Sequence, residues 1–255
     1  MTITPGARLP GLAEQIHSRH VDNGNGLITH LLEAGDADSS KPCLLLLHGF
    51  PELAYSWRKI MVPLAQAGYR VIAPDQRGYG RTQMIEHAGP VHYDMPLDPF
   101  RLLNLVRDQL GLLHALGIDQ VQAVIGHDFG SPVAAWCALT RPDVFRRVVL
   151  MSAPFGGPPV FARTATASIN AIDPDALLAL ERPRKHYQWY YSTEPANQDM
   201  MQCAQGLHDF LRAYYHYKSA DWAGNKPVEL AGWQASELAK MPTYYVMDAA
   251  DDMAG

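Results

Sequence analysis

The feature that most constrains this chain is the pentapeptide GHDFG at residues 126–130, which joins an apolar run to a helical segment. Residues 121–125 have the composition of a buried strand, and residues 131–141 that of a helix, in whose first turn Pro132 is tolerated. A glycine-flanked turn between a strand and a helix lifts its middle residue above the edge of the sheet. The sequence therefore predicts an α/β fold that presents Asp128 at a strand-to-helix elbow.

An aspartate at the elbow favours one kind of chemistry. Its carboxylate is ionised at neutral pH. It can attack an alkyl carbon by displacement and form an ester that water later cleaves. A serine at this position would instead indicate acyl transfer. Backbone N–H groups at the start of the following helix can stabilise the negative charge. We therefore expect Asp128 to be the nucleophile of a covalent hydrolytic reaction.

The first 155 residues alternate strand-like and helix-like segments, which is typical of a mainly parallel sheet flanked by helices. The Asn-Gly-Asn-Gly segment at 23–26 is a strong hairpin signal between the first two strands. Residues 43–47 are apolar throughout, as expected for a strand buried on both faces. The predicted strands cover residues 15–22, 27–34, 43–47, 69–73, 121–125 and 144–151, and further helices cover 54–67 and 98–116.

The character of the chain changes after residue 155. The remaining residues are rich in aromatic residues, Gln, Asn and Pro, and they predict short helices joined by irregular loops. A single short strand is predicted over residues 243–247. We therefore expect two domains, an α/β core over residues 1–155 with the first six strands and a helical cap over residues 156–255.

A second motif, His48-Gly49-Phe50-Pro51, directly follows the third predicted strand. In α/β folds with a nucleophile at such an elbow, the loop after this strand supplies one N–H group of an oxyanion hole. The residue after the nucleophile supplies the other N–H group. We assign these two donors to the backbone of Phe50 and of Phe129. His48 is interpreted as a hydrogen-bonding residue of the loop and not as a catalytic base.

A third motif, DQRGYG at residues 75–80, predicts a turn in which its aspartate and its arginine form a structural pair. Taken in order, HGFP at 48–51, DQRGYG and GHDFG at 126–130 resemble the epoxide hydrolase and haloalkane dehalogenase branch of the α/β-hydrolase fold. The resemblance covers residues 15–155. It implies Asp128 as nucleophile and a cap inserted after the sixth strand.

Phe129 distinguishes the two enzyme types of this branch. Dehalogenases usually place Trp after the nucleophile, where its indole N–H holds the departing halide, and Phe has no such donor. Epoxide opening needs an acid, which in this family comes from cap tyrosines. The stretch YQWYY at 187–191 resembles the one that bears the first of them, with Tyr187 at the matching position. We expect opening of an epoxide to a vicinal diol through an ester on Asp128, with haloalkane or haloacid dehalogenation as the alternative.

The family pattern also has a histidine base and a carboxylate after the cap, and here the sequence departs from it. The histidines after the elbow, His186, His208 and His216, fall in predicted cap helices, and the second cap tyrosine is not found. We therefore expect a C-terminally truncated chain that lacks the last core strands and cannot turn over. Its sixth strand would have an unpaired outer edge. A catalytically inactive binding protein of the same fold is a second alternative.

Composition limits the partners. The net charge is −5 and the basic residues form no stripe, which argues against nucleic-acid binding. No apolar run is long enough for a membrane span, and three widely spaced cysteines favour a reducing, cytoplasmic location. No metal-ligand spacing is found, and the expected chemistry needs no cofactor. The expected partner is a small apolar epoxide. The sequence leaves its identity, its stereochemistry and the oligomeric state open.

Overall fold

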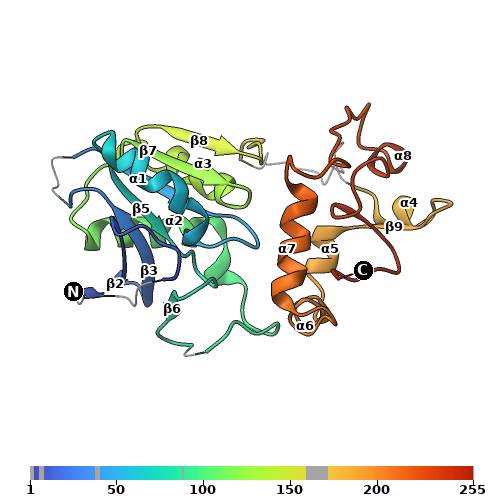
Figure 1. Ribbon diagram of the computed structural model, residues 1–255, viewed down its shortest axis with the longest axis horizontal. Helices are drawn as coiled ribbons and strands as arrows, with labels where there is room; N and C mark the ends of the chain where they lie inside the picture. The colour runs from blue at the N-terminus through green and yellow to red at the C-terminus, as the bar shows by residue number, and fades with distance from the viewer. Residues whose placement is uncertain (1–2, 6–8, 38–40, 88, 159–171, 255) are drawn as a thin grey trace, which may run out of the picture. The chain divides into compact units, whose positions relative to one another are not determined.

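The computed structural model describes residues 3–5, 9–37, 41–87, 89–158 and 172–254. The chain divides into two compact units, Met1–Pro159 and Val160–Gly255. The first unit contains the large sheet with its helices, and the described part of the second contains short helices and a two-stranded sheet (Figure 1).

The large sheet of the first unit is mixed. Its parallel half consists of β5, β4, β7 and β8, and its antiparallel half of β1, β2 and β3, with β6 paired to β3. This arrangement confirms the α/β class predicted from the sequence. In spatial order the strands are β1 (Ile3–Pro5), β2 (Ile16–Asp22), β3 (Leu27–Ala34), β5 (Arg70–Pro74), β4 (Cys43–Leu47), β7 (Ala123–His127) and β8 (Val148–Met151), and β6 is Gln83–Met84.

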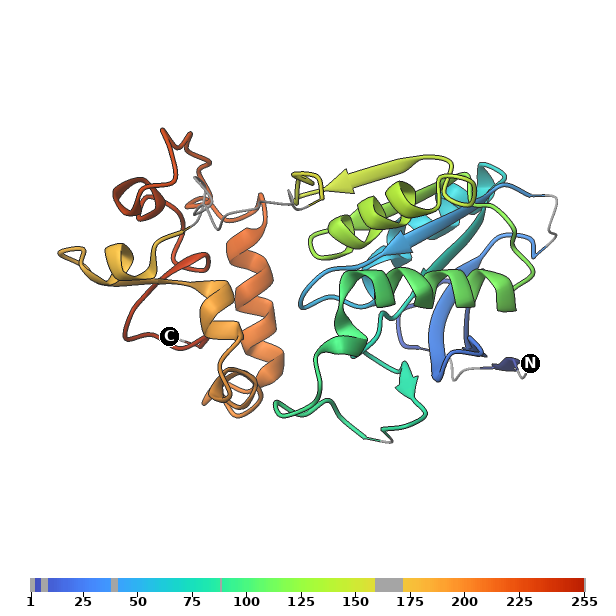
Figure 2. The same ribbon diagram turned by 180° about the vertical axis from the view of Figure 1, so that it is seen from behind.

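Helices cover both faces of this sheet (Figure 2). Successive side chains of a strand point to opposite faces, so β4 contributes to two separate cores. Leu44 and Leu46 pack with Met61 of α1, whereas Leu45 and Leu47 pack with residues of α2 and α3. The helices are α1 (Arg58–Gln66) after η1 (Ala54–Trp57), α2 (Leu102–Ala115) after η2 (Asp98–Phe100), and α3 (Gly130–Thr140).

Strand β8 forms one edge of the sheet. It pairs with β7, and no strand of the described residues pairs with its outer edge. Val148, Val149 and Met151 are between 40% and 45% exposed. The strand is shorter than predicted because Phe145 makes only an isolated bridge with Val121. Exposed apolar side chains on an unpaired edge are a surface that proteins usually cover.

The predicted pair between Asp75 and Arg77 is wrong. The carboxylate of Asp75 accepts a hydrogen bond from Nδ1 of His30 at 2.7 Å. Arg77 instead donates two hydrogen bonds to Asp108 on α2, at 2.7 and 2.6 Å. Both side chains of the Arg77–Asp108 pair are almost fully buried. Asp75 is thus paired with a residue of β3 and Arg77 with a residue of α2, so the turn is attached to both elements.

The buried Arg77–Asp108 pair leads to a stability prediction. Removing one partner leaves the other charge buried without compensation, so Asp108→Ala is expected to lower the free energy of unfolding by about 3–5 kcal/mol. Urea denaturation followed by circular dichroism measures this change. The control is Asp143→Ala, which removes the exposed partner of Arg141 and should leave the midpoint unchanged. Equal midpoints for the two variants would contradict the prediction.

The second unit has its own small core. Strands β9 (Arg184–His186) and β10 (Val246–Asp248) pair antiparallel, with Val246 opposite His186. Val246 packs with Leu177 and Leu238. The predicted strand at 243–247 is therefore present but shifted toward the C-terminus. The helices of this unit are α4 (Pro174–Leu178), α5 (Tyr187–Tyr191), α6 (Pro195–Met201), α7 (Leu207–Lys218) and α8 (Ala235–Leu238).

Among the helices that the structure describes, none is both long and apolar enough to cross a lipid bilayer.

Candidate active site

The elbow between β7 and α3 depends on close backbone contacts. A Cβ atom at Gly126 would lie 2.1 Å from the carbonyl oxygen of Gly130. A Cβ atom at Gly130 would lie 2.2 Å from the carbonyl oxygen of Leu47 on β4. Only glycine fits these two positions without displacing the backbone. The two glycines of the motif therefore allow the strand, the turn and the helix to approach one another.

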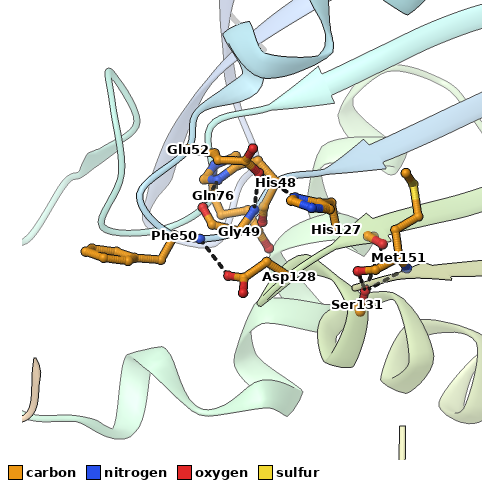
Figure 3. A network of polar contacts seen from close by, with 10 residues as sticks. His48, Gly49, Phe50, Glu52, Gln76, His127, Asp128, Ser131 and Met151 are labelled. Atoms are coloured by element: carbon orange, nitrogen blue, oxygen red, sulfur yellow. Dashed lines mark hydrogen bonds and ion pairs between the residues drawn. The ribbon is translucent and has the colours of Figure 1, made fainter. Parts of the chain in front are cut away.

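Asp128 has a strained backbone that its neighbours hold in place. Its φ is +51°, a left-handed conformation that costs a residue with a side chain about 1–3 kcal/mol. Its N–H donates to the carbonyl of Met151 on β8 at 3.0 Å, and its carbonyl accepts from the N–H of Ser131 at 2.9 Å. The hydroxyl of Ser131 bonds in turn to the backbone of Gly126 and Met151 (Figure 3). These bonds fix the strained residue from both sides.

The loop after β4 meets the side chain of Asp128. The backbone N–H of Phe50 donates to Oδ1 of Asp128 at 2.9 Å (Figure 3). The loop can come this close to Asp128 because Gly49 has no side chain. A Cβ at Gly49 would lie 2.3 Å from Cβ of Asp128. The structure thus brings together two residues that the sequence placed at the ends of two different strands, the predicted nucleophile and one predicted oxyanion donor.

Phe129 is the N-cap residue of α3. Backbone N–H groups in the first turn of a helix have no acceptor within the helix, and the helix dipole favours negative charge there. Its side chain is 41% exposed and carries no hydrogen-bond donor. The second oxyanion donor is expected to be the backbone N–H of the residue directly after the nucleophile, and Phe129 is in that position. The role of its N–H stays a prediction.

Tyr187 lies in the second unit, as the first residue of α5. Its ring contacts the rings of Tyr191 and Tyr245, with centroids 5.1 and 5.4 Å away. The side-chain amide of Gln188 donates to its hydroxyl at 3.3 Å. Tyr187 is therefore part of an aromatic cluster of its own unit, and its predicted role as proton donor stays a prediction.

His48 is held by both ring nitrogens, which confirms its structural interpretation. Nε2 accepts from the backbone N–H of Gln76 at 3.0 Å, and Nδ1 donates to the carbonyl of Gly49 at 2.9 Å. Burial lowers the pKa of His48, which favours the neutral ring. The ring of Tyr79 lies edge-on to it at 5.0 Å. Burial and then the charge of Asp128 raise the pKa of Tyr79 to about 12.

Two residues of the site were not singled out from the sequence. His127 donates from Nδ1 to Oε2 of Glu52 at 2.7 Å, and both side chains are partly buried. Burial would raise the pKa of Glu52, but the hydrogen bond and the charge of His127 outweigh it and hold this pKa below its usual range. The available signal was position, since Glu52 directly follows the HGFP motif and His127 precedes Asp128.

Within the described ranges, no group of three or more His, Cys, Asp or Glu side chains is arranged to hold a metal ion.

The sequence model of the α/β-hydrolase fold family matches residues 42–236 of this chain. These residues include the elbow, the loop after β4 and most of the second unit. The chain belongs to the α/β-hydrolase fold family.

Similar α/β-hydrolases include several epoxide hydrolases. Epoxide hydrolase B of Mycobacterium tuberculosis is 37% identical over 183 residues, which are 71% of this chain and 48% of the relative. Epoxide hydrolase 3 of Siraitia grosvenorii is 42% identical over 135 residues, 52% of this chain and 38% of the relative.

Solved structures that are similar to this chain also include epoxide hydrolases. An epoxide hydrolase from an endophytic Streptomyces matches with a TM-score of 0.60 and 34% identity, over 80% of this chain and 53% of that one. The structure of potato epoxide hydrolase I matches with a TM-score of 0.58 and 33% identity, over 77% of this chain and 56% of that one. This α/β-hydrolase chain spans about half the length of the mycobacterial relative and of these solved structures.

Proposed function

We propose that this chain carries the ester-forming part of an epoxide hydrolase active site, with Asp128 as the nucleophile. The observation that supports the proposal most is the hydrogen bond from the Phe50 N–H to Oδ1 of Asp128 at 2.9 Å, on a strained elbow. Because Oδ1 is held by this donor, Oδ2 is the oxygen left to attack. The similarity to epoxide hydrolases supports the same assignment.

The proposed reaction has two steps. In the first, Oδ2 of Asp128 forms a bond to the less hindered ring carbon, the ring C–O bond breaks, and Tyr187 donates a proton to the leaving oxygen. In the second, a base removes a proton from water, whose oxygen bonds to Cγ of Asp128, and the bond between Cγ and Oδ2 then breaks. Oδ2 leaves in the vicinal diol and takes the proton from the base, and Tyr187 regains its proton from solvent. The N–H groups of Phe50 and Phe129 would stabilise the oxyanion on Oδ1 during this step.

Two other functions remain as alternatives. A haloalkane or haloacid dehalogenase would use the same nucleophile, and measuring halide release from such substrates distinguishes it. The lack of a donor on the Phe129 side chain favours the epoxide. A catalytically inactive protein of this fold would bind small apolar molecules without modifying them, so ligand binding with an unmodified Asp128 would support that alternative.

The second step needs a histidine base paired with a carboxylate, and in the expected order of the family this histidine follows the nucleophile, whereas His127, which pairs with Glu52, precedes it. The histidines after the elbow lie in the second unit, and one of them, His208, pairs with Asp209 at 3.1 Å. Both side chains of that pair are mostly exposed, with relative accessibilities of 83% and 66%. An exposed pair of this kind does not resemble the buried and oriented base of a hydrolase.

A protein of these 255 residues is therefore expected to form the ester and to keep it. Incubation with an aryl epoxide should consume about one equivalent of epoxide per chain and then stop, because the nucleophile is not regenerated. Liquid chromatography of epoxide and diol over time measures this. Steady diol production over many equivalents would contradict the expected stall, and no consumption of epoxide would contradict the proposed function itself.

A further inference from the structure

The loop that carries the Phe50 donor is closed by a short turn. The N–H of Glu52 donates to the carbonyl of Gly49 at 3.1 Å. In the opposite direction, the N–H of Gly49 donates to Oε2 of Glu52 at 3.4 Å. Phe50 lies at the tip of this turn, with its N–H directed at Asp128 (Figure 3). The direction of the donor therefore depends on the orientation of the Glu52 turn.

Two attachments hold the loop, and they have different partners. His48 joins its beginning to the end of β5 through the N–H of Gln76. Glu52 joins its end to His127, the last residue of β7, and β7 is the strand that carries Asp128. The beginning of the loop is connected to β7 by the pairing of β4 with β7, and Glu52 connects the end of the loop to the same strand. Movement of β7 relative to the loop would change the distance between the Phe50 donor and Asp128.

We propose that the Glu52–His127 pair positions the Phe50 N–H on Oδ1 of Asp128 and so controls the reactivity of the nucleophile. Glu52 and His127 are positioning residues in this proposal, because they act through the loop and the strand and do not touch the reacting carbon. The inference rests on the proposed function, since reactivity is defined by attack on an epoxide. The expected mechanism assigns no role to either of these two residues.

The charges of the pair are consistent with this role. Glu52 is a carboxylate near Asp128, and two neighbouring negative charges oppose each other. His127 directly precedes Asp128 in the chain and is hydrogen-bonded to Glu52, so a protonated His127 would offset the charge of Glu52 next to the nucleophile. Its hydrogen bond also keeps the pKa of Glu52 low, so the bond persists as the pH falls through the ordinary range of a glutamate.

The test is the rate of Asp128 alkylation by an aryl epoxide at saturating concentration, measured by intact-protein mass spectrometry. Displacing a donor by about 1 Å can cost about 100-fold in rate, so Glu52→Ala and His127→Ala should each slow alkylation by about that factor. The double variant should be no slower than the slower single variant, because both remove the same bond. The epoxide concentration at half-maximal rate should not change.

Two further variants separate positioning from general destabilisation. Glu52→Gln keeps a carbonyl oxygen that accepts from His127 and Gly49, and it should recover most of the lost rate. Glu86→Ala removes an exposed glutamate of the same unit and should react like the parent chain. Additive effects of the two alanine variants, or a Gln variant as slow as Ala, would overturn the proposal.

Hydrogen–deuterium exchange of the Phe50 amide separates this inference from the proposed function. The amide is bonded to Asp128 in the parent chain, so it should exchange at least about tenfold faster in Glu52→Ala. If the parent chain is not alkylated, the proposed function fails, and the exchange rate alone decides whether the pair positions the donor. Unchanged exchange in Glu52→Ala would overturn the positioning role whatever the alkylation assay gives.

Discussion

Gly49→Ala is expected to slow alkylation of Asp128 strongly although it adds only one methyl group. The new Cβ would lie 2.3 Å from Cβ and 2.4 Å from Oδ1 of Asp128, far inside van der Waals contact. The Cβ of Asp128 is bonded directly to the backbone and cannot rotate away, so either the loop or the elbow must move. A shift of this kind separates the Phe50 donor from Oδ1 and should lower the alkylation rate by about 100-fold or more.

Gly156→Ala is the matched control for this experiment. Among the described residues, no atom lies within 4 Å of a Cβ at Gly156, and neither glycine has a left-handed φ, so the two substitutions differ in what the methyl group meets. The control should be alkylated like the parent chain. Thermal unfolding of both variants shows whether the fold is retained. Alkylation of Gly49→Ala at the parent rate would mean that the contact between the loop and Asp128 is not needed.

The sequence was sufficient for the elements with strong local signals. The hairpin of β2 and β3 was predicted within one residue because the Asn-Gly turn marks its position. Strand β4 was predicted with its observed bounds, since its five apolar residues are buried on both faces. Strands β1, β6 and β9 have only two or three residues each and exist because distant segments pair with them. No local pattern predicts such strands.

In the candidate site, too, some contacts were predicted from local motifs and others were not. Asp128 and the Phe50 donor were predicted together because their motifs follow β7 and β4, which are adjacent parallel strands that end at the same edge. The partners of the DQRGYG turn were not predicted correctly, since they come from β3 and α2 and not from the turn itself. The Glu52–His127 pair joins residues 75 positions apart, and spacing along the chain carries no signal for it.

Asp128→Asn is the second change with a large expected effect. The substitution keeps a carbonyl oxygen that can accept from Phe50, and the backbone bonds of the elbow to Met151 and Ser131 do not involve the side chain. The fold should therefore be retained. The amide nitrogen that replaces the attacking oxygen is not a nucleophile, so ester formation should be lost completely.

The most direct measurement is peptide mapping of the chain after reaction with an aryl epoxide. The free thiol of Cys203 is half-buried and can itself be alkylated, so the experiment is done in a Cys203→Ser background. We expect one added hydroxyalkyl group, located on Asp128 by tandem mass spectrometry and absent from Asp128→Asn. An adduct on another residue, or an equal yield of adduct in Asp128→Asn, would contradict the assignment of Asp128 as the nucleophile.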